Sequence, residues 1–149
     1  MTQENKELLL KDICARLPYK PIVRIDDCGI WNLRGVDHDD SAELRDIVIV
    51  WHGKNYPSSK SSFPIIDCKP YLFPISSMTE EQLFEVQEIF GKNEIKIEDG
   101  FLRIVDSDRN TISYLEILAL LNWFYKNHFD INGLIPMGLA IDATGLNIY

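Results

Sequence analysis

The sequence predicts an α+β fold, with a mainly antiparallel sheet of five to six strands flanked by two or three helices. Apolar residues recur at helical spacing over residues 4–16, 79–90 and 113–127. Short apolar runs between these segments are bounded by glycine, proline and aspartate, which is typical of strands. A single domain over residues 1–149 is expected, because two domains would each be too small to bury a good core.

The first half of the chain predicts one helix followed by four strands. Leu9 and Ile13 lie one turn apart on a common face of the helix expected at 4–16. The strands are expected at residues 20–26, 30–36, 46–51 and 65–72. The run 46–51 (DIVIVW) is apolar after its first residue, which favours burial on both faces of a sheet. Residues 53–64 are rich in serine, lysine and proline and are expected to form a loop.

The second half predicts a helix, a hairpin and a further helix. Thr79 and Gln82 have the spacing of a capping box and indicate the start of a helix. Asp99-Gly100 is a preferred pair for a two-residue turn. It predicts a hairpin with strands at 94–98 and 101–105. The segment 113–127 is apolar nearly all round, so it is expected to be the central core helix.

The formal net charge of −8 bears on the class of partner. It disfavours nucleic acid, whose binding needs clustered Lys and Arg facing phosphates. It also disfavours an anionic membrane surface, and it is compatible with a basic partner protein. The three cysteines are odd in number and scattered, and no apolar leader follows Met1. We therefore expect a cytoplasmic protein without disulfides.

No complete catalytic, metal or cofactor motif is visible. Asp37, His38 and Asp39 offer oxygen and imidazole ligands, but adjacent loop residues cannot all point at one ion, so a solvated acidic loop is favoured. Residues 106–117 imitate the start of a calcium loop but lack its glycine and its final glutamate. No nucleophile has the spacing of a hydrolytic triad around His52. No cofactor is expected.

Two further groups of residues are candidates for binding. Aromatic and cationic side chains gather around the loop at 53–64 and could hold an anionic nucleotide-like molecule: Trp51, His52, Lys54, Tyr56 and Lys60. An exposed loop made soluble by lysine and serine is the alternative. Trp123 and Tyr125, near the end of the last helix, could form an oligomer interface, with burial inside the fold as the alternative.

Three segments carry a resemblance to known proteins. They are residues 7–19 (ELLLKDICARLPY), 69–81 (KPYLFPISSMTEE) and 129–143 (FDINGLIPMGLAIDA). They resemble stretches of small uncharacterised proteins of phages and prophages of gut anaerobic bacteria. The resemblance implies an accessory phage protein made inside a bacterium, and it transfers no site residue.

The favoured hypothesis is a non-enzymatic phage accessory protein. It would use its acidic surface to bind a host protein that acts in defence or metabolism. One alternative is a protein that sequesters an anionic nucleotide through residues 51–60. The other is a small hydrolase that uses His52 or the 37–40 cluster. A homo-oligomer is compatible with each hypothesis.

Overall fold

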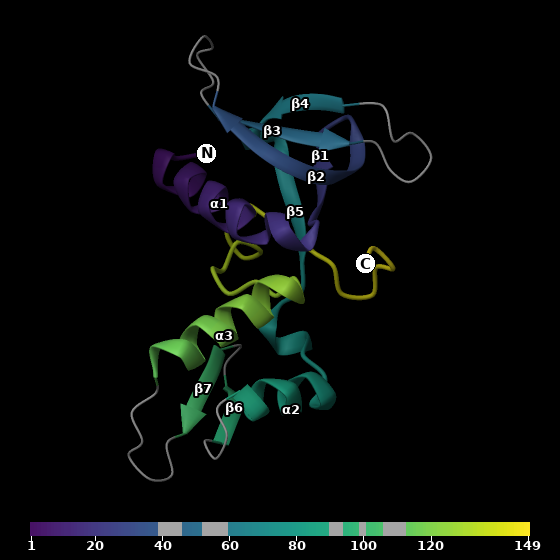
Figure 1. The fold of residues 1–149 in the computed structure, drawn as a ribbon. Coiled ribbons are helices and arrows are strands. Elements are labelled where there is room, and N and C mark those ends of the chain that lie inside the picture. Colours follow the sequence, from purple (N-terminus) through teal and green to yellow (C-terminus); the bar gives the residue numbers. More distant parts are fainter. Residues whose placement is uncertain (39–45, 52–59, 90–93, 99–100, 106–112) are drawn as a thin grey trace.

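The computed structural model describes residues 1–38, 46–51, 60–89, 94–98, 101–105 and 113–149 (Figure 1). Its first element is the helix α1 (Gln3–Arg16), whose N-cap Thr2 accepts a hydrogen bond from the Asn5 N–H. Leu9 and Ile13 are fully buried on its inner face, as the sequence predicts. A short 3₁₀ turn, η1 (Leu17–Tyr19), ends the helix because Pro18 cannot continue it.

The main sheet is built from strands in the order β4-β3-β2-β1-β5-β8. Their bounds are β1 (Ile22–Ile25), β2 (Gly29–His38), β3 (Asp46–Trp51), β4 (Lys60–Pro64), β5 (Cys68–Leu72) and β8 (Ile141–Asp142). Neighbouring strands pair antiparallel except β5 and β8, whose two-residue pairing is parallel. The sheet is therefore mixed. A register shift between Leu33 and Gly35 interrupts the β2–β3 ladder.

The main core lies between α1 and this sheet (Figure 1). Apolar side chains of α1, the sheet and the C-terminal segment form it: Leu9, Ile13, Val23, Ile25, Trp31, Leu33, Ile65, Cys68, Leu72, Leu134, Leu139 and Ala140. The inward residues of β1 alternate with outward ones, so that Val23 and Ile25 are buried and Arg24 is exposed.

A second, smaller unit lies beyond the end of β5 (Figure 1). It contains a 3₁₀ turn, two α-helices and a hairpin. Their bounds are η3 (Ile75–Ser77), α2 (Glu80–Ile89), β6 (Glu94–Glu98), β7 (Phe101–Val105) and α3 (Tyr114–Lys126). The two helices pack through Val86, which is fully buried, with half-buried residues such as Leu83, Leu120 and Trp123 around it. This unit therefore has a much smaller core than the main sheet.

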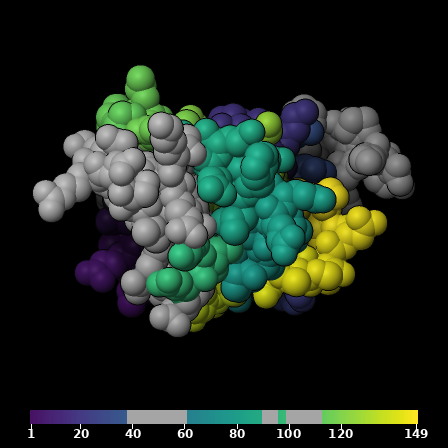
Figure 2. All heavy atoms as spheres, turned by 90° about the horizontal axis from the view of Figure 1, so that it is seen from below, coloured from purple at the N-terminus to yellow at the C-terminus, as the bar shows by residue number. Residues whose placement is uncertain are grey.

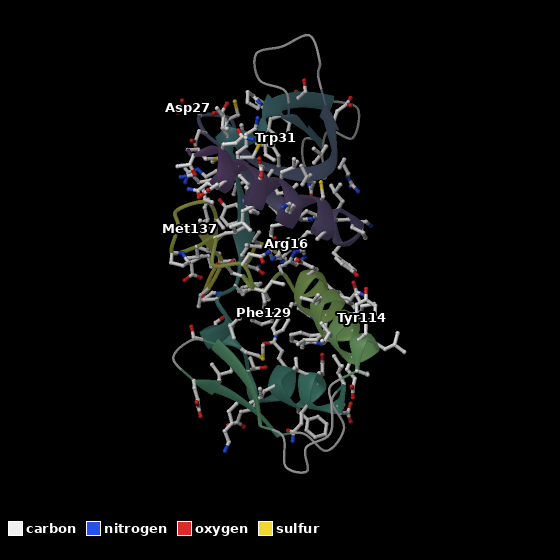
Figure 3. The ribbon with its side chains drawn as sticks, turned by 90° about the vertical axis from the view of Figure 1, so that its left-hand side faces the viewer. Arg16, Asp27, Trp31, Tyr114, Phe129 and Met137 are labelled. Carbon is white, nitrogen blue, oxygen red and sulfur yellow. The ribbon has the colours of Figure 1, made fainter. Side chains whose placement is uncertain are left out.

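The two units meet at a buried polar cluster. Arg16 of α1 donates to the Asp12 carboxylate at 2.6 and 2.9 Å and to the Phe129 carbonyl at 2.7 Å. Its guanidinium also lies 5.0 Å from the centre of the Tyr125 ring. Figure 3 shows Arg16 and Phe129 at this junction, between α1 and the end of α3. Asn132 donates to the Asp12 carboxylate at 2.9 Å and completes the cluster.

The α+β class is confirmed, and α1, α2 and α3 lie where helices are predicted. Three finer expectations are wrong. Residues 60–64 form β4 rather than part of a loop, and residues 65–67 form a 3₁₀ turn, η2 (Ile65–Asp67), rather than the start of a strand. The hairpin β6–β7 forms at its predicted residues, but as a separate two-stranded sheet and not as part of the main one.

A further wrong expectation concerns α3, which is not the central core helix. Phe124 is its only buried residue, and α1 occupies the central position on the main sheet. An all-round apolar helix is normally buried. In this fold the segment packs at the small unit, where less of the chain is available to cover it.

Candidate functional site

Among the described residues, the largest group of exposed apolar side chains lies on the first two turns of α3. The exposed fractions are 72% for Tyr114, 74% for Leu115, 44% for Ile117 and 37% for Leu118. We name these four residues the α3 face. Figure 3 shows Tyr114 at the N-terminal end of α3, and in Figure 2 bright green atoms of this helix project from the upper edge of the molecule.

Local sequence holds these turns in helical form. Ser113 is the N-cap: its hydroxyl accepts from the Glu116 N–H at 3.2 Å, and the Glu116 carboxylate accepts from the Ser113 N–H at 2.6 Å. These two hydrogen bonds with Ser113 lower the pKa of the Glu116 carboxyl group. The capping box presents the α3 face on a defined helix start, although its apolar side chains have little cover.

Packing explains why the α3 face is open. Leu118 and Tyr125 are seven residues apart and therefore lie on nearly the same side of the helix. At Tyr125 that side is covered by Arg16 of α1, whereas α1 does not cover Leu118, which is exposed. The opposite side packs against α2 through Leu120 and Trp123. The C-terminal turns of α3 are thus held on two sides and the N-terminal turns on one.

The helix α2 contributes negative charge at the same end of the molecule. Four of its ten residues are exposed glutamates: Glu80, Glu81, Glu85 and Glu88. Glu85 accepts a hydrogen bond from the Trp123 indole at 3.0 Å and so ties α2 to α3. The helix contains no lysine or arginine. An apolar face and an acidic helix therefore belong to one unit.

The predicted nucleotide-binding residues are only partly described. Trp51 ends β3 and Lys60 begins β4, and the two pair directly across the ladder. Trp51 also pairs with Asn32 of β2. The remaining three candidates, His52, Lys54 and Tyr56, lie outside the described residues. The nucleotide hypothesis stays a prediction.

The predicted metal candidates lie at the end of β2. Asp37 and His38 pair with Ile47 and Asp46 of β3, and Asp39 lies outside the described residues. In the part of the chain that the structure describes, no three His, Cys, Asp or Glu side chains are grouped in a way that could hold a metal ion. The calcium-like segment at 106–117 is described only from residue 113 onward.

Trp123 and Tyr125 make contacts inside the chain. Both side chains are half-buried. Trp123 stacks on Phe129, with ring centroids 5.6 Å apart and an angle of 11° between the planes. Tyr125 lies under the Arg16 guanidinium. Their role in an oligomer stays a prediction. The large apolar side chains that α3 does expose lie on its first two turns.

The cysteines differ in their capacity to act as nucleophiles. Cys68 is buried and donates to the Pro64 carbonyl at 3.4 Å. Burial, with smaller contributions from Asp67 and Asp26, raises the pKa of Cys68 to about 12. Its thiol is therefore protonated near neutral pH and unsuited to nucleophilic catalysis. Cys14 and Cys28 are exposed.

One cavity of about 180 Å³ lies at the start of α2. It is lined by Phe73, Ser77, Thr79, Gln82 and Phe129. The capping box of α2 uses the acceptor atoms of Thr79 and Gln82, at 3.2 and 2.9 Å. Ligand pockets in proteins usually measure about 300–1,000 Å³.

Sequence reasoning missed the α3 face because it treated the whole helix as core. A usable signal was present: the four residues after Ser113 include Tyr114, Leu115 and Ile117 without a neighbouring polar stripe. A helix of that composition must meet either the core of its own chain or another surface. The choice depends on how much chain lies near it.

Comparison of the chain with protein-family models, curated protein sequences and solved structures finds no significant match. Across the helices that the structure describes, none has both the length and the apolar character that a membrane span requires.

Proposed function

We propose that this protein is a non-enzymatic binding protein whose α3 face docks on a partner protein. The observation that carries the proposal is the exposure of Tyr114 and Leu115, each with more than two thirds of its surface accessible, beside Ile117 and Leu118. Contiguous exposed apolar patches of a few hundred Å² often mark interaction sites. An apolar helix face that meets a complementary groove or helix is a common recognition mode.

Charge supports a basic partner rather than a second copy of the chain. The sequence holds 23 acidic and 15 Lys or Arg residues, and α2 places four exposed glutamates in the same unit as the α3 face. A two-fold dimer through this face would bring two acidic units together. A basic partner would instead be steered toward the face by the field of these charges.

The resemblance to phage proteins suggests the setting. On that basis the partner is a protein of the bacterial host, bound in the cytoplasm, and the binding counters a host activity. The resemblance supplies the setting only, and the α3 face supplies the mode of binding.

The test is a double substitution on the face, Leu115→Glu with Leu118→Glu. We expect it to abolish capture of a stoichiometric partner from bacterial lysate at low salt. The free energy of unfolding should fall by no more than about 2 kcal/mol, because Leu115 is mostly exposed and Leu118 is 37% exposed. Asn122→Glu is the matched control, since Asn122 is exposed one turn beyond Leu118 and is already polar.

Several outcomes would contradict the proposal. The wild-type chain could recover no stoichiometric partner even at low salt, or the double variant could retain its partner. A third contradicting outcome comes from size-exclusion chromatography with light scattering. If the wild-type chain were a dimer and the double substitution dissociated it, the α3 face would bind a second copy of the chain. A complex that weakens between 50 and 300 mM salt fits the basic partner.

A further inference from the structure

Tyr149 is 44% exposed, and its ring lies between the end of the β1–β5 ladder and the His128 ring, in a position that we name the Tyr149 slot. It stacks on the His128 imidazole, with ring centroids 3.9 Å apart and an angle of 11° between the planes. On another side it meets Phe73, with centroids 5.9 Å apart and the planes tilted by 51°. Aromatic neighbours on two sides make this a site with a defined ring orientation.

The hydroxyl group of Tyr149 is recognised separately. It donates to the Tyr71 carbonyl at 2.7 Å and accepts from the Ile22 N–H at 3.4 Å. Strands β1 and β5 pair from Ile25 opposite Cys68 to Val23 opposite Pro70, so Ile22 and Tyr71 are next in the same register. The hydroxyl therefore bridges a backbone donor and acceptor at the point where the β1–β5 ladder stops.

The His128 ring, which forms one wall of the slot, is buried and neutral. His128 is buried, and its Nδ1 atom has no hydrogen-bond partner in the part of the chain that the structure describes. Burial first, and the Arg16 charge second, lower the pKa of His128 to about 4, so the ring is neutral near pH 7. A buried nitrogen without a partner is unfavourable, so the neutral ring makes its main described contact through its face, on which Tyr149 stacks.

The segment that carries Tyr149 has few other contacts. Thr144, Gly145, Leu146 and Asn147 are exposed. The hydrogen bonds described in this stretch are local: the Leu146 N–H donates to the Ala143 carbonyl at 3.0 Å, and the Thr144 N–H donates to the Asp142 carboxylate at 2.8 Å. Local opening is least costly where buried apolar contacts are few, so the segment can leave the slot without disturbing the sheet.

We propose that this slot is a binding site for a p-hydroxyphenyl group, and that Tyr149 is an intramolecular occupant which an external group of the same chemistry displaces. The external group can be a tyrosine side chain of a partner or a free phenol, because both present the same ring and hydroxyl. The site is separate from the α3 face and does not depend on it.

The first experiment empties the slot. The variant Tyr149→Gly is compared with Leu146→Gly, which changes the same segment equally but keeps the ring. Thermal unfolding is followed with increasing p-cresol, the analogue of the tyrosine side chain. We expect a saturable rise in the melting temperature of Tyr149→Gly, because a ligand that binds only the folded state stabilises it. Leu146→Gly should need a higher p-cresol concentration for the same rise.

Toluene tests recognition of the hydroxyl. It fills the same space but leaves the Tyr71 carbonyl and the Ile22 N–H unpaired, so its affinity for Tyr149→Gly should be at least about tenfold weaker than that of p-cresol. Equal affinities would overturn the assignment of a phenol site, and so would a failure of p-cresol to bind. If Tyr149→Gly does not fold, Tyr149→Phe replaces it: p-cresol should displace this ring at lower concentration than it displaces Tyr149.

Displacement is tested on the wild-type chain by nuclear magnetic resonance. Saturating p-cresol should shift the amide signals of Ile22 and Phe73 and move those of Gly145 and Leu146 to unfolded positions. A segment that stays docked at every concentration would overturn the exchange. A peptide with the sequence of residues 144–149 distinguishes the sources: at least tenfold tighter binding than p-cresol indicates a protein tyrosine, and equal binding indicates a free phenol.

Discussion

Arg16 is fully buried where α1 meets the end of α3, and its replacement by methionine tests how much its buried polar cluster stabilises the fold. The substitution removes two hydrogen bonds to the Asp12 carboxylate and one to the Phe129 carbonyl. It also leaves the buried Asp12 with Asn132 as its remaining donor among the described residues. Breaking a buried ion pair from one side costs about 3–5 kcal/mol, because a charge stays behind without its partner.

The assay is urea unfolding at pH 7, followed by tryptophan fluorescence and far-ultraviolet circular dichroism. We expect Arg16→Met to lower the free energy of unfolding by about 3–5 kcal/mol, and the melting temperature by roughly 6–20 °C for a chain of this size. Lys11→Met is the matched control: it removes a charge from the exposed side of the same helix and should change stability by less than about 0.5 kcal/mol.

A double substitution separates the charge from the packing. Asp12→Leu with Arg16→Met replaces the ion pair by apolar side chains and leaves no buried charge, so it should recover most of the loss. A loss below about 1 kcal/mol for Arg16→Met alone would refute the reasoning. So would a double variant that is no more stable than the single one.

Three further predictions concern individual side chains. The pKa of His128 falls from 6.5 to about 4 on folding, so the unfolded chain binds a proton first as the pH decreases. The neutral His128 ring contributes fully to the free energy of unfolding above pH 6.5. This contribution should be lost progressively toward pH 4, by up to about 3 kcal/mol. His128→Asn, which tolerates the left-handed backbone there, should lack this part of the decline in urea unfolding between pH 7 and pH 5. Cys14 and Cys28 should react quickly with a thiol reagent in the native protein, and Cys68 only after unfolding, because it is buried and protonated; three equal rates would contradict this. Ser113→Ala should cost about 1 kcal/mol in thermal unfolding through loss of the capping box, and an unchanged melting temperature would show that the cap is dispensable.

Local signals predicted the helices and the hairpin. The bonds between Thr79 and Gln82 form as their spacing indicates, and the strands on either side of Asp99-Gly100 pair from Glu98 opposite Phe101 onward. Each of these features depends on residues within a few positions of one another. The interactions that decide them are therefore contained in a short stretch of sequence.

The candidate sites were less accessible to such reasoning. His128 and Tyr149 are 21 positions apart in the sequence. Tyr149 and Tyr71, which share a hydrogen bond, are 78 positions apart. No periodicity or motif relates residues at these distances. The cationic aromatic group around Trp51 was visible because its members are close in sequence, and of these the structure places Trp51 opposite Lys60.

The sequence by itself determined the α+β class, the helix positions and the acidic charge, because composition and short-range spacing encode them. Only the tertiary structure decided which apolar surfaces are covered. Leu118 and Tyr125 lie on nearly the same side of one helix, yet α1 reaches Tyr125 and leaves Leu118 exposed. Burial depends on which distant segments meet in the fold: Arg16 of α1 contacts Tyr125 of α3, and its cluster joins residues over 100 positions apart.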